Sequence, residues 1–152
     1  MKFILILIFS FICAQSQVKV IGVKDGDTVV VLDKGNVPKT LRLAEVDCPE
    51  TRQPFGKNAK QFTSDMVFGK MITYTSTDTD RYGRTIAKVY LPNGKYLSEE
   101  IIKAGLGWWY FKYSDNKNLG KLEANARQNK LGLWQDPKSI SPWEWRKQRR
   151  SK

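Results

Sequence analysis

Residues 42–50 read RLAEVDCPE, a stretch that begins as an alternating strand and ends in a charged turn. Successive side chains of a strand fall on opposite faces, although neither face here is wholly apolar. Pro49 ends the strand because proline cannot donate a hydrogen bond to a neighbouring strand. We therefore expect Asp47 and Glu50 at a strand end, with Arg42 on the strand that leads to them.

Apolar and β-branched runs on both sides of this stretch predict a small barrel. The expected strands cover residues 18–23, 28–32, 39–46, 71–75 and 85–91. Asp25-Gly26 is typical of a tight turn between the first two strands, with glycine free to take a positive φ. The predicted fold class is α+β, mainly β: a five-stranded OB-type β-barrel with three α-helices.

Helical spacing and turn residues predict where the three helices lie. The first is expected to begin at Pro54 and to end before Gly69. Its apolar residues recur on one face, which indicates a stripe that packs on the core. That stripe consists of Phe55, Ala59, Phe62 and Met66. A short second helix is expected to be capped by Ser98, and a third contains residues 119–126.

Length and composition favour one basic domain. The chain has 152 residues, with 26 basic and 15 acidic side chains, a net charge of +11 and an isoelectric point near 9.7. This balance favours a polyanionic partner, nucleic acid or an anionic membrane, although a merely soluble basic protein has the same composition. The absence of histidine excludes a His-ligated zinc site and leaves acid–base chemistry to other side chains.

Residues 1–16 are expected to be a signal peptide. Lys2 precedes an apolar run over residues 3–12 that is too short to span a bilayer comfortably. Small residues at 14 and 16 predict cleavage before residue 17, with a lipid anchor through Cys13 as the alternative. Cleavage removes Lys2, lowers the charge from +11 to +10, and leaves Cys48 without a disulfide partner. We expect a secreted or periplasmic monomer with no stable protein partner and no membrane contact.

The mature chain divides into a domain over residues 17–142 and a C-terminal tail over residues 143–152. The tail mixes Trp143 and Trp145 with five basic residues, so we interpret it as an auxiliary contact for polyanions. Trp108 and Trp109 are further aromatic residues, of which we expect one in the core and one free to stack on bases.

Asp27 and Asp47 are the candidate metal ligands. A single aspartate in such a position is usually a turn former or a cap, but two at the ends of paired strands can share one divalent ion. Oxygen ligands favour Ca²⁺, Mg²⁺ or Mn²⁺ over softer metals, and the backbone carbonyl of Cys48 can add a further ligand.

Glu50, Arg42 and Arg84 are candidates for the remaining chemistry of phosphodiester cleavage. Glu50 can accept a proton from an attacking water. Each arginine can hold phosphate oxygens and stabilise the charge of a pentacoordinate transition state. Taken singly, such a glutamate is more often a solvated loop acid and such an arginine a surface ion-pair partner, so the case for catalysis rests on the complete set.

Three motifs in this order resemble those of the staphylococcal nuclease (thermonuclease) family. They are Asp25-Gly26-Asp27-Thr28, the RLAEVDCPE stretch at residues 42–50, and Asp80-Arg81-Tyr82-Gly83-Arg84. The likeness runs from about Val18 to Trp145, which is nearly the whole mature chain.

The resemblance implies a nuclease domain of OB fold that cuts DNA and RNA with Ca²⁺ and leaves 3′-phosphate and 5′-hydroxyl ends. Carried over by position, the calcium ligands are Asp27, Asp47 and the carbonyl of Cys48. The catalytic residues are Arg42 and Arg84, as a phosphate clamp, and Glu50, as the general base. The substrate-binding residues are Arg81, Tyr82 and Tyr113.

The sequence is also compatible with two other functions. A non-catalytic nucleic-acid-binding barrel would keep the fold, but it has no need of all five charged residues of the catalytic and metal sets. A membrane-surface protein would act through residues 143–152, which leaves the carboxylates unexplained. A secreted, Ca²⁺-dependent nuclease accounts for both the charge and the motifs.

Overall fold

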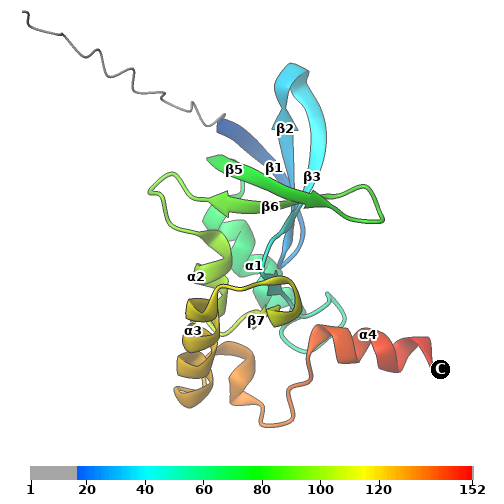
Figure 1. Cartoon of the computed structure of the whole chain (residues 1–152), viewed down its shortest axis with the longest axis vertical. Helices are drawn as coiled ribbons and strands as arrows, with labels where there is room; N and C mark the ends of the chain where they lie inside the picture. The colour runs from blue at the N-terminus through cyan, green and yellow to red at the C-terminus, as the bar shows by residue number, and fades with distance from the viewer. Residues whose placement is uncertain (1–16, 152) are drawn as a thin grey trace, which may run out of the picture.

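Five strands close into a barrel, in the order β1-β2-β3-β6-β5, in a computed structural model that describes residues 17–151 (Figure 1). The barrel strands are β1 (Gln17–Asp25), β2 (Thr28–Asp33), β3 (Val37–Leu43), β5 (Met71–Thr79) and β6 (Thr85–Tyr90). Neighbours pair antiparallel except β3 and β6, which run parallel. The predicted five-stranded barrel is confirmed, and the predicted signal peptide lies outside the described residues.

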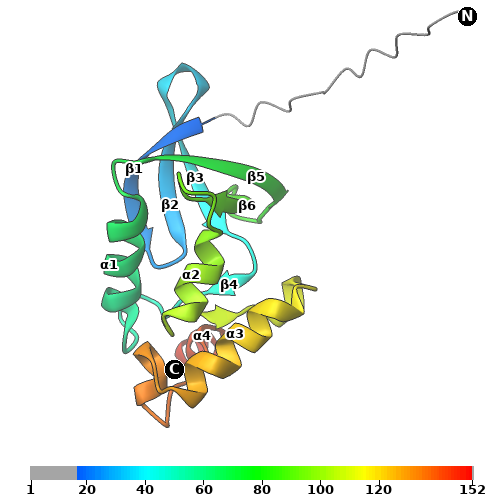
Figure 2. The ribbon, with the colours of Figure 1, turned by 90° about the vertical axis from the view of Figure 1, so that its left-hand side faces the viewer.

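Four α-helices lie within residues 17–151, one more than expected. They are α1 (Gly56–Val67), α2 (Leu97–Lys103), α3 (Lys117–Gln128) and α4 (Pro142–Arg150). Short 3₁₀ helices cover Lys34–Asn36, Phe111–Tyr113 and Gly132–Gln135. Figure 2 shows α1 and α2 beneath the barrel, with α3 and α4 beyond them. The additional helix is α4, which forms most of the segment predicted as a tail.

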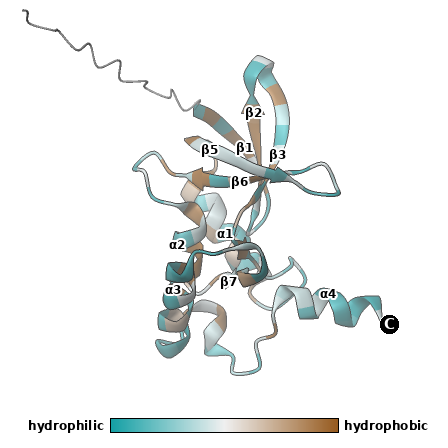
Figure 3. Ribbon diagram, in the orientation of Figure 1, coloured by the Kyte–Doolittle hydropathy of each residue, from teal (hydrophilic) through white to brown (hydrophobic). Residues whose placement is uncertain are grey.

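Alternating apolar side chains explain why these strands close around a common core. Val29 and Val31 of β2 and Leu41 of β3 are fully buried, and Ile101 and Ile102 of α2 join them from below. The apolar residues of β2 appear as brown segments of the ribbon in Figure 3. Burial of apolar area is the main favourable term in folding, so the alternation that predicts the strands also accounts for their stability.

The strand that contains Arg42 is shorter than predicted. We expected it to run to Val46, but β3 ends at Leu43 because Glu45 takes a positive φ of 68° and turns the chain. The Glu45 carboxylate accepts hydrogen bonds from the hydroxyls of Tyr96 and Ser114, at 2.9 Å each, which holds this turn. The chain then forms β4 (Val46–Asp47), which pairs with β7 (Trp108–Trp109) in a separate two-stranded sheet.

Two predicted helix starts are wrong, both for local reasons. Helix α1 begins at Gly56 rather than Pro54, because Phe55 before it has a left-handed φ of 64°. Helix α2 begins at Leu97, and Ser98 does not cap it. The buried Ser98 hydroxyl instead donates to the carbonyl of Ala44 at 2.8 Å, which ties α2 to the end of β3.

Strand β5 is longer than the predicted 71–75, because its polar second half pairs with β6 as far as Thr79 and Thr85. No helix in the described part of the chain is long and apolar enough to cross a membrane.

Candidate active site

The turn between β1 and β2 brings Asp27 against the first helix. A Cβ added to Gly26 would lie 2.8 Å from the Cβ atoms of both Ala59 and Cys48. The Gly26 carbonyl also accepts a hydrogen bond from the buried Thr63 hydroxyl at 2.6 Å. Glycine is therefore required here by close packing, and not by the positive φ that we predicted, since Gly26 is not among the residues of positive φ.

Asp27 and Asp47 converge on one nitrogen atom. Nη2 of Arg42 lies 3.2 Å from Oδ2 of Asp27 and 2.9 Å from Oδ1 of Asp47. Both carboxylates are buried, Asp47 to 1% exposure. The pairing of β4 with β7 places Asp47 there, and the backbone N–H of Cys48 donates to Oδ2 of Asp27 at 2.7 Å. The two predicted metal ligands are thus neighbours in the structure.

Arg42 uses both terminal nitrogens within the protein. Its Nη1 donates to the carbonyls of Leu43 and Val46 at 2.7 and 2.8 Å, while Nη2 faces the two aspartates. A guanidinium between two buried carboxylates offsets their mutual repulsion. Arg42 therefore organises the two carboxylates, and the phosphate-binding role predicted for it stays a prediction.

Asp25 is a third acidic residue of the site that the sequence reasoning did not select. Its Oδ1 accepts a hydrogen bond from the backbone N–H of Asp27 at 3.2 Å. Burial and the neighbouring charge of Asp27 raise the pKa of Asp25 to about 7. Burial likewise raises the pKa of Asp47, although Arg146 and Arg42 oppose the rise. The signal for Asp25 was its place in the Asp25-Gly26-Asp27 turn.

Glu50 meets a residue from the far end of the chain. Nη1 of Arg146 donates to Oε1 of Glu50 at 2.8 Å, and Nη2 donates to Oδ2 of Asp47 at 2.7 Å. Arg146 lies on α4, which the sequence reasoning treated as an auxiliary tail. No local pattern marks this arginine, because it is 96 residues from Glu50 along the chain.

Arg84 is held at the edge of the site by its own turn. Its Nε donates to Oδ2 of Asp80 at 2.7 Å, and its Nη1 lies 3.5 Å from the Thr28 hydroxyl. That hydroxyl donates to Oδ1 of Asp27 at 3.1 Å, which connects Arg84 to the carboxylates. Part of the Arg84 guanidinium faces solvent, so it remains available to an incoming phosphate.

The predicted substrate-binding residues form two exposed groups. Arg81 donates to the Tyr82 hydroxyl at 2.7 Å and lies over its ring, beside Arg84. Tyr113 is exposed and packs against Tyr110, with ring centroids 4.7 Å apart. The first group lies beside Arg84, which connects it to the carboxylates. Tyr113 instead lies beside Tyr110, on which Trp143 of α4 stacks.

Trp108 belongs to the core, as expected for one of the two tryptophans. It is buried, and its ring contacts Trp134 and Trp143 edge to face. Trp109 is half-buried, its backbone N–H donates to Glu123 at 2.6 Å, and its ring contacts Phe111.

The donor set fits a hard divalent cation. Among residues 17–151 no three His, Cys, Asp or Glu side chains converge as a ready metal cluster. Asp27 and Asp47 nevertheless approach the same point, where Arg42 Nη2 supplies positive charge. Arg42 and Arg146 already balance the charge of these carboxylates, so the fit to a metal rests on ligand type: carboxylate oxygens suit Ca²⁺, Mg²⁺ or Mn²⁺.

Comparison with known proteins places this arrangement in a family. Residues 40–136 match the model of the family described as Staphylococcal nuclease homologue. The chain belongs to the staphylococcal nuclease family. The matched range includes Arg42, Asp47, Glu50 and Arg84, while Asp27 and helix α4 lie outside it.

Bacterial relatives in the staphylococcal nuclease family extend over nearly the whole chain. An uncharacterized endonuclease of Haemophilus influenzae is 38% identical over 148 residues, which cover 95% of this chain and 83% of that protein. An uncharacterized endonuclease of Escherichia coli O157:H7 is 36% identical, with 95% and 97% covered. A micrococcal nuclease of Shigella flexneri is 34% identical, with 88% and 82% covered.

Proposed function

We propose that this nuclease is a Ca²⁺-dependent enzyme that hydrolyses DNA and RNA to products with a 3′-phosphate and a 5′-hydroxyl. The convergence of Asp27 and Asp47 beside Arg42, with Glu50 adjacent, carries the proposal. This arrangement supplies the oxygen ligands, the base and the cationic groups that phosphodiester hydrolysis requires.

The chain's own residues divide the work of the reaction. Glu50 accepts the proton of a water whose oxygen attacks the phosphorus. The bond from phosphorus to the 5′-oxygen breaks and that oxygen takes up a proton from solvent, so the phosphate stays on the 3′ side. Arg84, oriented by Asp80, holds non-bridging phosphate oxygens and stabilises their charge as it develops. Arg81, Tyr82 and Tyr113 contact the bound nucleotides.

Asp27, Asp47 and the Cys48 carbonyl would hold the cation. Ca²⁺ bound there would supply positive charge for the phosphate and a site for water. A site with two carboxylates and a carbonyl suits Ca²⁺ better than Mg²⁺, which demands near-ideal octahedral geometry. Burial keeps the Cys48 thiol protonated, because it raises the pKa of that group well above its ordinary value.

We further propose that the enzyme acts outside the cytoplasm. The apolar run at residues 3–12 behind Lys2 supports an export signal. Cys48 is a free, buried cysteine, so the described fold does not depend on an oxidising compartment. Fractionation of cells that express the full chain, with mass measurement of the product, tests both export and cleavage before residue 17.

The decisive experiment incubates purified protein with single- and double-stranded DNA and with RNA, in Ca²⁺, in Mg²⁺ or in chelator. We expect cleavage of all three substrates in Ca²⁺, with 3′-phosphate ends, and none in chelator. Asp47→Asn is the matched inactive control, because it removes the charge and keeps the shape. Binding without cleavage in Ca²⁺ would instead favour a non-catalytic nucleic-acid-binding barrel.

A further inference from the structure

Arg146 of α4 contacts both Asp47 and Glu50. The proposed chemistry requires these two carboxylates to be held at a fixed distance and orientation. We propose that Arg146 is a positioning residue of this nuclease: it holds Glu50 beside Asp47, and α4 thereby completes the active site. The inference rests on the proposed function, since it assigns Arg146 a role through Glu50. It changes the interpretation of residues 143–152 from an auxiliary tail to a structural part of the site.

The contacts of Arg146 match a two-carboxylate clamp. Its Nη2 lies 2.7 Å from Oδ2 of Asp47, and its Nη1 lies 2.8 Å from Oε1 of Glu50 and 3.3 Å from Oδ1 of Asp47. A guanidinium is planar and presents paired N–H groups, so it can hold two carboxylates at once, which a lysine ammonium does less precisely.

Arg42 and Arg146 have different partners in this arrangement. Arg42 contacts Asp27 and Asp47 from the barrel side, whereas Arg146 contacts Asp47 and Glu50 from the helix side. Asp47 is nearly fully buried, while the Glu50 side chain is 39% exposed. A half-exposed glutamate has many accessible rotamers, so Glu50 is the residue whose orientation depends most on Arg146.

Helix α4 is anchored independently of that ion pair. Ser141 and Glu144 form a capping box at its start. The ring of Trp143 stacks on Tyr110 at 5.5 Å with an interplanar angle of 4°, and it meets Trp108 edge to face. These contacts fix the first turn of α4. Arg146 follows that turn on the same helix, so its backbone is held in place while its side chain contacts the carboxylates.

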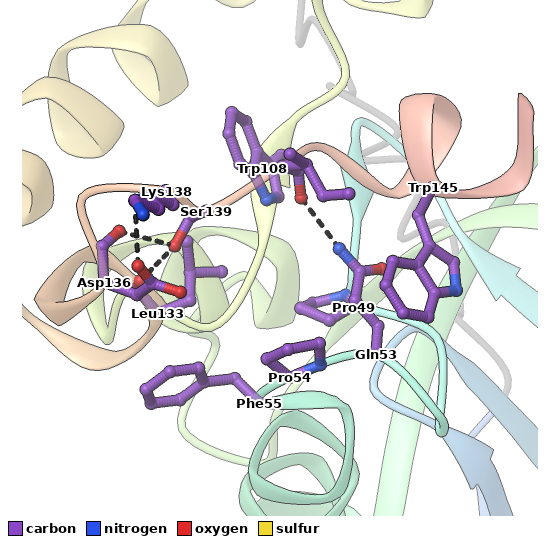
Figure 4. Close-up of a pocket in the computed structure, with 11 residues that line it drawn as sticks. Pro49, Gln53, Pro54, Phe55, Trp108, Leu133, Asp136, Lys138, Ser139 and Trp145 are labelled. Carbon is purple, nitrogen blue, oxygen red and sulfur yellow. Dashed lines mark hydrogen bonds between the residues drawn. The ribbon is translucent and has the colours of Figure 1, made fainter. Parts of the chain in front are cut away.

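The loop that carries Glu50 packs against the segment that precedes α4. Trp145 lines one pocket together with Pro49 and Gln53, and the side-chain amide of Gln53 donates to the carbonyl of Ile140 at 2.7 Å (Figure 4). The side-chain oxygen of Gln53 also accepts a hydrogen bond from the backbone N–H of Glu50, at 3.2 Å. Both the loop and the helix are thus held where the ion pair forms.

Kinetic measurements on the full mature chain test the proposal. The variants are Arg146→Gln, Arg146→Lys and, as a control of equal charge change, the exposed Lys121→Gln on α3. We expect Arg146→Gln to lower kcat on single-stranded DNA by about 10–10²-fold, since a misplaced catalytic group costs about that much. KM should change by less than about twofold, and Lys121→Gln should behave as the parent.

A double-mutant cycle separates positioning from general damage. In a Glu50→Gln background, Arg146→Gln should lower kcat by less than about twofold further, because the residue it positions is already disabled. Arg146→Lys keeps the charge and should lose most of the rate, which keeps the test informative if Arg146→Gln fails to fold. An equal loss in both backgrounds overturns the proposal. A higher kcat in Arg146→Gln also overturns it, since Arg146 would then be an inhibitory latch.

Thermal unfolding in chelator supplies a readout that does not depend on activity. Removal of a partner from a buried carboxylate should lower the Tm of Arg146→Gln by about 3 °C or more relative to Lys121→Gln. An unchanged Tm would show that Arg146 does not hold the carboxylates. If the parent protein cleaves no nucleic acid, the proposed function fails. The Tm comparison still shows whether Arg146 holds the two carboxylates.

Discussion

Asp47 illustrates at the scale of single residues how the site tolerates buried charge. Its side chain is 1% exposed, yet both of its oxygens face guanidinium nitrogens, from Arg42 and from Arg146. Burial favours the neutral form of a carboxylate and raises the pKa of Asp47, and the two arginines oppose that rise. Neighbouring acidic residues share an arginine, Arg42 between Asp27 and Asp47 and Arg146 between Asp47 and Glu50, so the effects of their substitutions are expected to be coupled.

Glu50→Gln should remove the general base and keep the shape of the side chain. We expect kcat on DNA to fall by about 10²–10⁴-fold, the usual contribution of such a group. Binding of a nucleoside bisphosphate in Ca²⁺ should be kept, as measured by calorimetry. Glu99→Gln, at an exposed ion pair on α2, is the matched control. An undiminished kcat would remove Glu50 from the mechanism.

Asp27→Asn should weaken Ca²⁺ binding without loss of the fold, because an amide oxygen can still accept from the Cys48 N–H. Loss of an outer-shell partner alone typically costs 10–100-fold in metal affinity, so loss of a ligand should cost at least about tenfold. Titration calorimetry with CaCl₂ measures this, with Asp65→Asn, on the exposed face of α1, as the control. Parent-like affinity would show that Asp27 is not a ligand.

The geometry of the site depends on how closely the surrounding strands and helices pack against one another. The β1–β2 turn fits between α1 and the chain at Cys48 only because residue 26 lacks a side chain. The β4–β7 pair and the reversal at Glu45 place Asp47 next to that turn. Helix α4 supplies Arg146 from the opposite side, while its outer end is hydrophilic (Figure 3).

Gly26→Ala should therefore damage the site through packing. The new methyl group would meet two Cβ atoms at 2.8 Å, and overpacking of this kind costs about 1–3 kcal/mol. We expect a lower Tm together with weaker Ca²⁺ binding, as Asp27 moves. Gly22→Ala is the matched control, because its Cβ would lie 3.6 Å from Val30, an ordinary contact. Equal behaviour of the two variants would contradict this account.

Net charge acts at the scale of the whole molecule. The described domain belongs to a chain of net charge +11, which would be +10 without Lys2. The excess of lysine and arginine attracts the polyanion over the surface as a whole, and the site then selects the phosphate to be cut.

Binding to nucleic acid should consequently weaken steeply with salt. For single strands, each neutralised phosphate contributes about −0.7 to the slope of log K against log salt, so a slope of about −2 or steeper is expected for an oligonucleotide. Fluorescence anisotropy in chelator measures it without cleavage. A dinucleotide, which has few phosphates, is the control and should show a shallow slope. A flat slope for the oligonucleotide would mean that the net charge plays no part in binding.

Local sequence was enough to predict the barrel and most of the charged residues that meet in it. Alternation of apolar residues reports which side of a strand faces the core, and this is why the five strands were found with errors mainly at their ends. The motifs at residues 25–28, 42–50 and 80–84 likewise combine turn residues with charge in short segments, where spacing alone is informative.

Tertiary structure decided what those short segments could not encode. The break at Glu45 depends on Tyr96 and Ser114, and the need for glycine at residue 26 depends on Ala59 and Cys48. Arg146 lies 99 residues from Asp47 along the chain, and only the packing of α4 brings it to the carboxylates. A local pattern records the periodicity of one element, whereas the partners of a buried charge are settled when distant elements pack together, and for that reason the full set of partners in this site appears only in the folded chain.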